Sequence, residues 1–367
     1  MGTESSTLED LVMNNNFWKD KKIFLTGHTG FKGSWLSLLL NHLGAKVYGY
    51  SIGHPTDPSM FQKLNLESKI TSHIIGDIRD YDSLSNAINQ CQPDIIIHMA
   101  AQPIVRLSYL DPIETYSTNV MGTVNILSAF KNSDTRVLIN VTSDKCYQNN
   151  EWIWGYRESD RLGGHDPYSN SKACAELVTS AYQNSFFNLD HNKQLSSVRA
   201  GNVIGGGDWA KDRLIPDIYN SIKTNIPLNI RNPNSTRPWQ HVLEPLRGYI
   251  ILAEKMFVND NYSGAYNFGP NDIDCRSVSD ILNLVKNIRN NDFSWNVENN
   301  IENVHEANLL KLDCSKVKNK IGWNPVINLE ETIGMINDWY NHERDNLDTL
   351  YEFTISQIDR YLLNSIT

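Results

Sequence analysis

A tyrosine and a lysine four positions apart are the first residues whose types and spacing suggest chemistry. Tyr168 and Lys172 would lie one turn apart on a helix, so both side chains would project from the same face. A cation near the phenol would lower the pKa of Tyr168, which could then accept a proton from a substrate hydroxyl. We therefore expect a proton-transfer pair here, although the same spacing also occurs on ordinary surface helices.

Three further polar residues follow an apolar run over residues 136–141. They are Ser143, Asp144 and Lys145, and open α/β sheets bind their ligands at this position, outside the carboxyl end of a strand. We expect the hydroxyl of Ser143 to hydrogen-bond the substrate. Asp144 and Lys145 either form an exposed ion pair of little consequence or move protons in the reaction.

A glycine-rich segment near the start of the chain can bind a dinucleotide. It lies between a strand pattern and a helix pattern, and the helix N-terminus would face the pyrophosphate. Gly27 permits a tight turn, Gly30 lets the backbone approach the anion, and Gly33 allows close contact between helix and strand. Cofactor contacts are expected from seven residues: Gly27, His28, Thr29, Gly30, Phe31, Lys32 and Gly33.

The sequence favours NAD while leaving NADP open. Folds that prefer NAD often carry an acid at the end of the second strand, where this chain has Ser51. Lys32 is compatible with NADP, although a basic side chain beside a pyrophosphate is equally natural. Asp77, after the third strand, could bond the adenine amino group or belong to the start of the helix near Tyr81. The other expected cofactor contacts are Ile78, Ala100, Ala101, Tyr168 and Lys172.

Short apolar runs alternate with longer amphipathic patterns, as in repeated βαβ units. Strands are expected at residues 22–26, 46–50, 94–99, 136–141 and 196–199. Helices are expected at residues 34–43, 81–90, 113–130, 168–187, 242–256, 278–289 and 330–341. The pattern predicts an α/β fold of the Rossmann type, a doubly wound parallel sheet with a smaller C-terminal α+β region. We expect a mobile leader at 1–16, a dinucleotide-binding domain at 17–200 and a substrate-binding region at 201–367, interleaved with that domain.

The composition argues against several classes of partner. A net charge of −9 would repel nucleic acid, and no apolar stretch is long enough to cross a membrane. The 5 cysteines form no CxxC pair and the 10 histidines show no HxxxH spacing, so we expect reduced thiols and no metal site. The first residues lack the basic start and apolar middle of a secretory signal. We expect a cytoplasmic protein.

The glycine turn, Ser143, Tyr168 and Lys172 together resemble the extended short-chain dehydrogenase/reductase family. Within that family, an acid and a second proton-transfer group directly after the Ser or Thr are typical of the sugar-nucleotide 4,6-dehydratases. Those similar to the dTDP-glucose enzymes have Thr-Asp-Glu, where this chain has Ser-Asp-Lys. That lysine, with the segments at residues 27–35, 201–209 and 237–241, resembles the CDP-D-glucose 4,6-dehydratases. The resemblance covers nearly all of residues 17–269.

The resemblance implies a redox cycle that consumes no net cofactor. Tyr168 takes the proton of O4 as hydride leaves C4, and the resulting ketone acidifies C5. Lys145 then removes the C5 proton, Asp144 protonates the departing C6 hydroxyl, and hydride returns to C6. A lysine base must be neutral, whereas an ordinary lysine is protonated at pH 7. The implied substrate is CDP-glucose or a related nucleotide sugar, converted in the supply of deoxysugars for a bacterial surface glycan.

Several residues are candidates for holding this substrate. Arg237 corresponds to the phosphate-binding arginine of the family, and Arg213 either shares the diphosphate or is a solvent-facing charge at a helix start. Arg106 is expected to face the active site from a loop. Trp239, like Tyr219, either stacks on the nucleotide or lies in the core. The other expected substrate contacts are Gln102 and Asn202.

Two other functions are compatible with a cofactor site. A sugar-nucleotide epimerase or reductase would need Tyr168 and Lys172 but neither Asp144 nor Lys145. A catalytically silent dinucleotide-binding regulator would be expected to lose the tyrosine and lysine pair. Family members associate through two helices, so the resemblance also implies a homodimer, with a tetramer as the alternative.

Overall fold

The computed structural model describes residues 15–188, 192–290, 292–298 and 308–365. Most of the expected leader lies outside these residues, and the short helix α2 (Asn15–Trp18) begins within it. Trp18 is fully buried and ties this first helix to the core. Among the helices that the structure describes, none combines the length and the apolar character needed to span a membrane.

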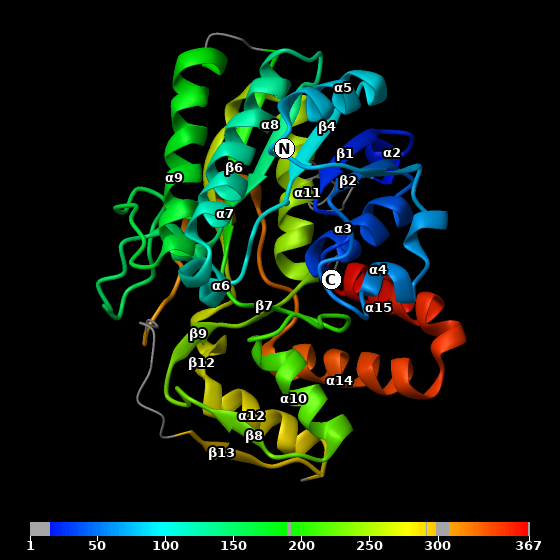
Figure 1. Cartoon of the computed structure of the whole chain (residues 1–367), viewed down its shortest axis with the longest axis vertical. Coiled ribbons are helices and arrows are strands. Elements are labelled where there is room, and N and C mark those ends of the chain that lie inside the picture. Colours follow the sequence, from blue (N-terminus) through cyan, green and yellow to red (C-terminus); the bar gives the residue numbers. More distant parts are fainter. Residues whose placement is uncertain (1–14, 189–191, 291, 299–307, 366–367) are drawn as a thin grey trace, which may run out of the picture.

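A seven-stranded parallel sheet forms the centre of the molecule (Figure 1). Its strand order is β11-β6-β5-β4-β1-β2-β3, so the winding reverses between β1 and β4. This is the doubly wound arrangement that the sequence predicts. The strands are β1 (Lys22–Thr26), β2 (Lys46–Ser51), β3 (Ser72–Ile75), β4 (Ile95–His98), β5 (Val137–Val141), β6 (Gln194–Ala200) and β11 (Gly264–Phe268).

Strand β1 shows why its apolar run forms a central strand. Side chains along a strand alternate between the two faces of the sheet. Ile23 and Leu25 belong to one hydrophobic core, whereas Phe24 belongs to the core on the other face. Such a run can be buried throughout only if helices cover both faces.

Helices cover both faces as this pattern requires (Figure 1). Side chains of α3 and α11 fill one core, and side chains of α5 and α8 fill the other, with the end of α9 packed against it. These helices are α3 (Phe31–His42), α5 (Tyr81–Cys91), α8 (Gly122–Lys131), α9 (Pro167–Tyr182) and α11 (Leu243–Val258). Shorter helices precede them at α4 (Met60–Lys63), α6 (Val105–Leu110) and α7 (Pro112–Tyr116).

The helix expected over residues 113–130 is interrupted. Between α7 and α8 the chain forms a wider π-helical turn (Ser117–Met121), and a second such turn (Gln183–Phe187) follows α9. The first turn directs the Asn119 side chain inward, where its Nδ2 donates to Ser171 Oγ at 2.9 Å. Such turns are frequent at functional sites.

The residues after β6 build a smaller region beside the carboxyl edge of the sheet (Figure 1). Its short strands pair as β7 with β10, β9 with β12 and β8 with β13. The chain re-enters the central layer through α11 and β11, so the two parts interleave. These strands are β7 (Val203–Ile204), β8 (Leu228–Ile230), β9 (Thr236–Pro238), β10 (Gln240–His241), β12 (Cys275–Ser277) and β13 (Trp295–Val297). The helices are α10 (Leu214–Thr224), α12 (Val278–Ile288), α13 (Ser315–Ile321), α14 (Leu329–Asp345) and α15 (Leu350–Asn364).

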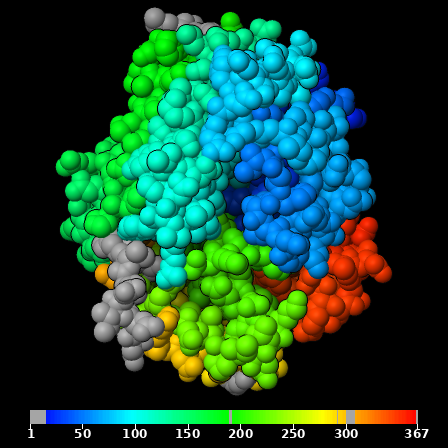
Figure 2. All heavy atoms as spheres, viewed as in Figure 1, coloured from blue at the N-terminus to red at the C-terminus, as the bar shows by residue number. Residues whose placement is uncertain are grey.

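A hollow opens between these two parts (Figure 2). It is bordered by the cyan segment around α6 and α7, by the lighter blue segment after β2 and by the green segment after β6, and dark blue residues near β1 lie at its floor. Ligands of doubly wound sheets bind at the carboxyl ends of the strands where the winding reverses. The hollow therefore lies where a ligand is expected.

Candidate active site

The glycine turn between β1 and α3 has the backbone that close approach requires. Gly27 has a φ of 71°, and a Cβ there would lie 2.8 Å from the backbone of Ala100. A Cβ at Gly33 would lie 2.1 Å from the carbonyl oxygen of Gly27. A Cβ at Gly30 would lie 3.4 Å from the nearest protein atom, so the protein itself leaves room for a side chain there. A strict requirement for glycine at this position would have to come from a bound ligand.

The first turn of α3 offers an anion site. Gly30 is its N-cap residue and provides no side-chain hydrogen bond to the turn. Unpaired N–H groups at a helix N-terminus favour a negative group. The turn therefore fits the pyrophosphate of a dinucleotide.

Three side chains of the turn point into the protein. The buried His28 ring lies with Nε2 2.7 Å from His73 Nδ1, and burial lowers the pKa of His28 to about 3. Thr29 Oγ1 lies 2.8 Å from Ser51 Oγ, which ties the turn to the end of β2. Phe31 packs against the hydrophobic core. These residues can reach a cofactor through their backbone while their side chains hold the turn.

Tyr168 and Lys172 are both buried at the start of α9. Asp166 caps this helix by accepting a hydrogen bond from the Ser169 N–H at 2.9 Å. Burial raises the pKa of Tyr168 to about 12, although a hydrogen bond with Ser143 opposes the rise. Burial also lowers the pKa of Lys172 to about 8. The prediction that the nearby lysine lowers the pKa of Tyr168 was therefore wrong. Loss of solvent disfavours the charged forms of both side chains, and this effect is larger than the attraction between them.

Asp144 is a buried carboxyl, not half of an exposed ion pair. Its Oδ1 accepts a hydrogen bond from Ser143 Oγ at 3.0 Å, and its Oδ2 has no hydrogen-bond partner among the described residues. A Cβ at Gly201 would lie 2.7 Å from Oδ2. Burial raises the pKa of Asp144, and the charges of Lys145 and Arg237 offset only part of this rise. The group is suited to staying protonated and then donating its proton.

Ser143 joins the acid to the redox pair. Besides its bond to Asp144, it hydrogen-bonds Tyr168 and accepts from the Lys145 N–H at 3.2 Å. Lys145 itself is partly buried. The structure thus brings Asp144, Tyr168 and the backbone N–H of Lys145 together around one serine hydroxyl, and Lys172 lies one turn along α9 from Tyr168.

Two of the expected arginines approach the catalytic residues. The charge of Arg213 acts on Tyr168, and that of Arg237 acts on Asp144. Arg213 pairs with Asp208 at 3.0 Å. Arg106 lies on helix α6 and not on the expected loop. It pairs with Asp212 at 3.1 Å, which ties this helix to the segment that carries Arg213.

The other candidates for substrate contact are held more tightly by the protein. Gln102 Nε2 donates to Thr115 Oγ1 at 2.8 Å, so its amide is engaged internally. Trp239 is 4% exposed and its Nε1 donates to the Arg276 carbonyl at 2.9 Å, which favours the core alternative. Asn202 is partly buried and its main-chain oxygen accepts from the Gln240 N–H at 3.2 Å.

The cofactor candidates after β3 and β4 differ in character. Asp77 forms an ion pair with Arg79 at 2.5 Å, and Asp80 is the residue that caps α5. Ile78 is buried where α8 begins, since a Cβ at Gly122 would lie 2.4 Å from its Cδ1. The small residues Ala100 and Ala101 follow β4 and are partly buried beside the glycine turn.

Comparison with known protein families covers nearly the whole of this arrangement. The family described as GDP-mannose 4,6 dehydratase matches residues 24–336, from the glycine turn past the candidate catalytic residues and the arginines. The chain belongs to the GDP-mannose 4,6-dehydratase family. CDP-glucose 4,6-dehydratase of Salmonella typhimurium is 54% identical over 335 residues, which cover 90% of this chain and 93% of that protein. The expected resemblance to the CDP-D-glucose 4,6-dehydratases is confirmed.

Solved structures share the fold of this 4,6-dehydratase family member. UDP-glucose 4-epimerase of Thermotoga maritima superposes with a TM-score of 0.77 at 19% identity, covering 88% of this chain and 100% of that chain. dTDP-glucose 4,6-dehydratase of Bacillus anthracis, in complex with NAD, superposes with a TM-score of 0.74 at 20% identity, covering 90% of this chain and 99% of that chain. Likeness at these identities shows the fold alone, and the Rossmann-type α/β prediction is confirmed.

Sequence reasoning missed the buried network behind the catalytic residues of this family member. Glu176, one turn after Lys172, pairs with Arg199 at 2.6 Å, and both side chains are almost completely buried. Glu176 also accepts hydrogen bonds from Thr142 and Ser197. The spacing of Glu176 from Lys172 was visible in the sequence, but its partner on β6 becomes known only from the strand order.

Sequence reasoning also missed Asn119. Its Oδ1 accepts from the Gln102 N–H at 2.8 Å and its Nδ2 donates to Ser171, the residue before Lys172. A π-helical turn has no simple sequence signal, so nothing in the pattern identified this residue.

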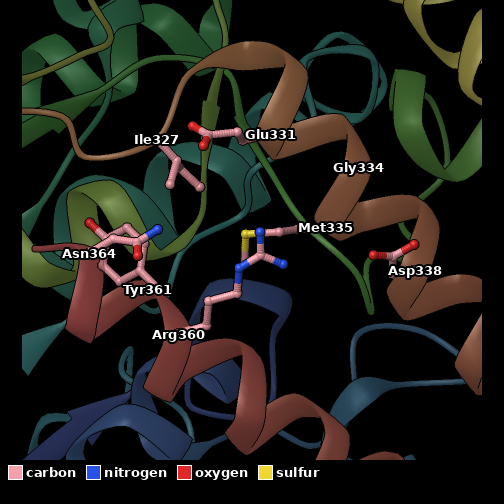
Figure 3. Close-up of a pocket in the computed structure, with 8 residues that line it drawn as sticks. All are labelled: Ile327, Glu331, Gly334, Met335, Asp338, Arg360, Tyr361 and Asn364. Carbon is pink, nitrogen blue, oxygen red and sulfur yellow. The ribbon is translucent and has the colours of Figure 1, made fainter.

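A pocket outlined in Figure 3 lies apart from the residues that the family resemblance assigns. It is lined by side chains of α14 and α15, among them Glu331, Asp338 and Arg360. No candidate catalytic or cofactor residue lines it. The candidate catalytic and cofactor residues lie instead at the carboxyl edge of the sheet.

Proposed function

We propose that the protein is a CDP-glucose 4,6-dehydratase that uses NAD. The observation that carries the proposal is the buried carboxyl of Asp144, held by Ser143 beside the tyrosine and lysine pair. An epimerase or a reductase needs the redox pair but has no step that requires an acid to expel a hydroxyl. The relative with 54% identity carries the name of this activity.

The crevice residues fit NAD. The pyrophosphate would lie against the glycine turn and the N-terminus of α3, with Asp77, Ile78, Ala100 and Ala101 along the remaining cofactor. NAD bound here would take hydride from the sugar and later return it. NAD is favoured over NADP because the Lys32 amine contacts Tyr249 instead of lying at the end of β2, where a 2′-phosphate would be.

The first step is oxidation at C4. Tyr168 accepts the proton of the C4 hydroxyl, which Ser143 also contacts, as hydride leaves the carbon. Because burial raises the pKa of Tyr168 to about 12, its phenolate needs nearby positive charge. Arg213 supplies part of this charge, and Lys172 lies one turn further along the same helix.

The second step is loss of water. The C4 ketone acidifies C5, and Lys145 takes the C5 proton in its neutral form. Asp144, whose pKa burial raises, gives its proton to the departing C6 hydroxyl. Loss of water leaves a C5–C6 double bond, and hydride returned to C6, with a proton given to C5 by Lys145, would complete the 4-keto-6-deoxy sugar. The proton that Tyr168 took from O4 would pass to solvent, from which Asp144 would be protonated again.

The diphosphate of the substrate would contact Arg213 and Arg237, whose planar guanidinium groups suit phosphate oxygens. Asn202, in the turn between β6 and β7, would bridge the cofactor and the sugar. The pairs of Arg213 with Asp208 and of Arg106 with Asp212 hold this side of the hollow together.

The proposal includes a cytoplasmic homodimer, with a tetramer as the alternative. Ile113 on α7, Met121 in the π turn and Leu177 on α9 are 81%, 52% and 58% exposed, and such apolar patches mark protein interfaces. Family members associate through these helices. The five cysteines are free, which fits a reducing compartment.

The direct test incubates the protein and NAD with CDP-glucose, dTDP-glucose, UDP-glucose and GDP-mannose in separate reactions. NMR of the sugar products identifies any 4-keto-6-deoxy hexose. We expect rapid product formation from CDP-glucose alone. Turnover of another nucleotide sugar with CDP-glucose unchanged would contradict the substrate, and epimerised product without loss of water would contradict the reaction.

A further inference from the structure

A third side chain continues the line of Tyr168 and Lys172 along α9. Glu176 follows Lys172 at the same spacing by which Lys172 follows Tyr168, so the three side chains lie on one face of the helix. All three residues are buried. The helix therefore places a carboxyl group one turn behind the redox pair.

Groups that follow or belong to two strands hold the Glu176 carboxyl. Thr142, which comes directly before Ser143, donates a hydrogen bond from its hydroxyl to Glu176 Oε1. Ser197 Oγ on β6 donates to Oε2 at 2.7 Å, and Arg199 Nη2 donates to the same oxygen at 2.6 Å. Both carboxyl oxygens are thus engaged, and the side chain is held in one position.

A second buried contact fixes α9 against β5. Residues two apart in an extended chain point to the same side, so Asn140 and Thr142 both face the helix. Asn140 Nδ2 donates to Thr179 Oγ1 at 2.7 Å, and Thr179 lies about one turn after Glu176. The end of β5 leads directly into the catalytic serine segment. It cannot slide along the helix that carries the redox pair without breaking both hydrogen bonds.

The Glu176 carboxyl also acts on Lys172 through its charge. Burial disfavours the carboxylate, but the Arg199 charge and the hydrogen bonds to the carboxyl outweigh this effect and hold the pKa of Glu176 below its ordinary value. Burial lowers the pKa of Lys172 to about 8, and the Glu176 charge opposes this fall. A charged amine one turn from Tyr168 would favour its phenolate.

Other titratable groups face the Lys172 amine from neighbouring elements. Cys146, after β5, also opposes the fall in the lysine pKa, but less than Glu176 does. The Cys146 thiol stays neutral at ordinary pH because burial raises its pKa. Lys172 also interacts with His98 at the end of β4, which is neutral because burial lowers its pKa to about 3, and with Lys32 on α3. Glu176 therefore supplies the negative charge that favours a charged Lys172 near neutral pH.

We propose that Glu176 is a positioning residue for the redox pair, which ties the end of β5 to α9 through Thr142 and keeps the Lys172 amine charged. Because its carboxyl oxygens are already engaged, Glu176 acts through these neighbours and not by contact with the substrate. The inference rests on the proposed function, because it assigns Lys172 to the oxidation at C4.

The first test follows the charge of Lys172 directly. The full chain is labelled with ¹³C at the lysine ε-carbon and titrated by NMR, and the resonance that is missing in Lys172→Met belongs to Lys172. In the wild type its midpoint should lie near pH 8. In Glu176→Gln the midpoint should fall by about one pH unit or more, because a neutral amide no longer opposes the loss of solvent.

A double variant separates the loss of the carboxylate from the release of its partner. Glu176→Gln alone leaves the Arg199 charge unpaired. Glu176→Gln combined with Arg199→Met removes both charges, so a lowered midpoint there comes from the missing carboxylate. The double variant buries no unpaired charge, and it decides the question if the single variant fails to fold.

Glu244→Gln is the matched control for general damage. The Glu244 carboxyl on α11 is also buried, and it accepts hydrogen bonds from the N–H groups of Val326 at 2.8 Å and Ile327 at 2.9 Å. Its loss should disturb the fold as a buried carboxyl does, and the Lys172 midpoint should stay at its wild-type value.

The second test breaks the link between β5 and α9. Thr142→Val keeps the shape of the side chain and removes the hydroxyl that donates to Glu176. We expect kcat with CDP-glucose to fall by about tenfold or more with little change in KM, because the serine segment loses its place relative to the redox pair. Thr142→Ser keeps the hydroxyl and should restore most of the rate.

The outcomes separate this inference from the proposed function. If the wild type forms no 4-keto-6-deoxy product from CDP-glucose, the proposed function is wrong, whereas the lysine titration needs no substrate. If product forms and the Lys172 midpoint is the same in the wild type and in the Glu176 variants, the inference is wrong and the proposed function stands. A wild-type kcat in Thr142→Val would overturn the inference as well.

Discussion

The catalytic edge of the sheet and the arginine-bearing region opposite it use ion pairs in different ways. At the edge, the side chains of Glu176 and Arg199 are 2% and 3% exposed. Across the hollow, the side chains of Arg106 and Asp212 are 40% and 38% exposed. A buried pair is costly to break because it leaves an uncompensated charge, whereas an exposed pair can exchange partners at little cost. The difference suggests that the reaction depends on groups held in fixed positions. Substrate binding would depend on exposed groups that can exchange one partner for another.

The largest expected effect on this comparison comes from Tyr168→Phe. The variant keeps the buried ring and removes the proton acceptor, so kcat should fall by about a hundredfold to ten-thousandfold while the fold is retained. Steady-state assays with CDP-glucose measure the rate, and thermal unfolding checks the fold. A kcat within a few-fold of wild type would remove the tyrosine from the redox step.

Breaking the buried pair should have the largest effect on stability. Glu176→Gln leaves the Arg199 charge without its partner, and the free energy of unfolding should fall by about 3 to 5 kcal/mol. Arg106→Met is the matched change in the exposed pair and should cost less than about 1 kcal/mol. Urea unfolding of both variants measures the difference. Equal losses would show that burial does not separate the two regions.

Acid should weaken the sheet edge through its buried histidines. His98 at the end of β4 is buried, its Nδ1 lies 2.8 Å from Thr26 Oγ1, and burial lowers its pKa to about 3. In the unfolded chain His98 takes up a proton below about pH 6.5, whereas in the folded protein it does so only near pH 3. Its contribution to stability is therefore complete above pH 6.5 and is lost as the pH falls through that window.

The expected size is about 1.4 kcal/mol per pH unit for each such histidine. In His98→Asn, the free energy of unfolding should depend less steeply on pH below about pH 6.5, because one fewer proton is taken up on unfolding. Urea unfolding at a series of pH values measures it. An unchanged slope would mean that His98 is already protonated in the folded protein.

The smallest expected effect comes from the substrate side. Arg213→Met removes one diphosphate contact, and KM for CDP-glucose should rise by about tenfold with a smaller change in kcat. Steady-state kinetics give both constants. A loss in kcat alone would show that Arg213 acts in the reaction and not in substrate binding. The effect of the Arg213 charge on the pKa of Tyr168 would then explain the loss.

The sequence predicted the parts of the site that local backbone rules control. The doubly wound parallel sheet followed from alternating strand and helix patterns, although its strand order and the edge strand β11 did not. The glycine turn followed from its spacing, with the left-handed φ of Gly27 as the clearest example. The start of α9 near Tyr168 was also expected from the helix pattern, and the structure adds that Asp166 caps it.

The rest depends on burial and on contacts between distant segments. The pKa of Tyr168 was expected to fall and instead rises, because the sequence showed the nearby lysine but not the loss of solvent. Arg199 and Glu176 meet only once β6 lies beside β5. The inward turn of His28 depends on Gly49, since a Cβ there would lie 2.2 Å from the His28 ring. None of these contacts has a local pattern.

The central claim is that Asp144 supplies the proton with which the C6 hydroxyl leaves, apart from the redox step at Tyr168. The most direct measurement follows CDP-glucose and NAD with Asp144→Asn in D₂O by NMR. We predict that C4 oxidation and deuterium exchange at C5 continue while the 4-keto-6-deoxy product falls by about a hundredfold or more. Dehydration by this variant at the wild-type rate would contradict the account.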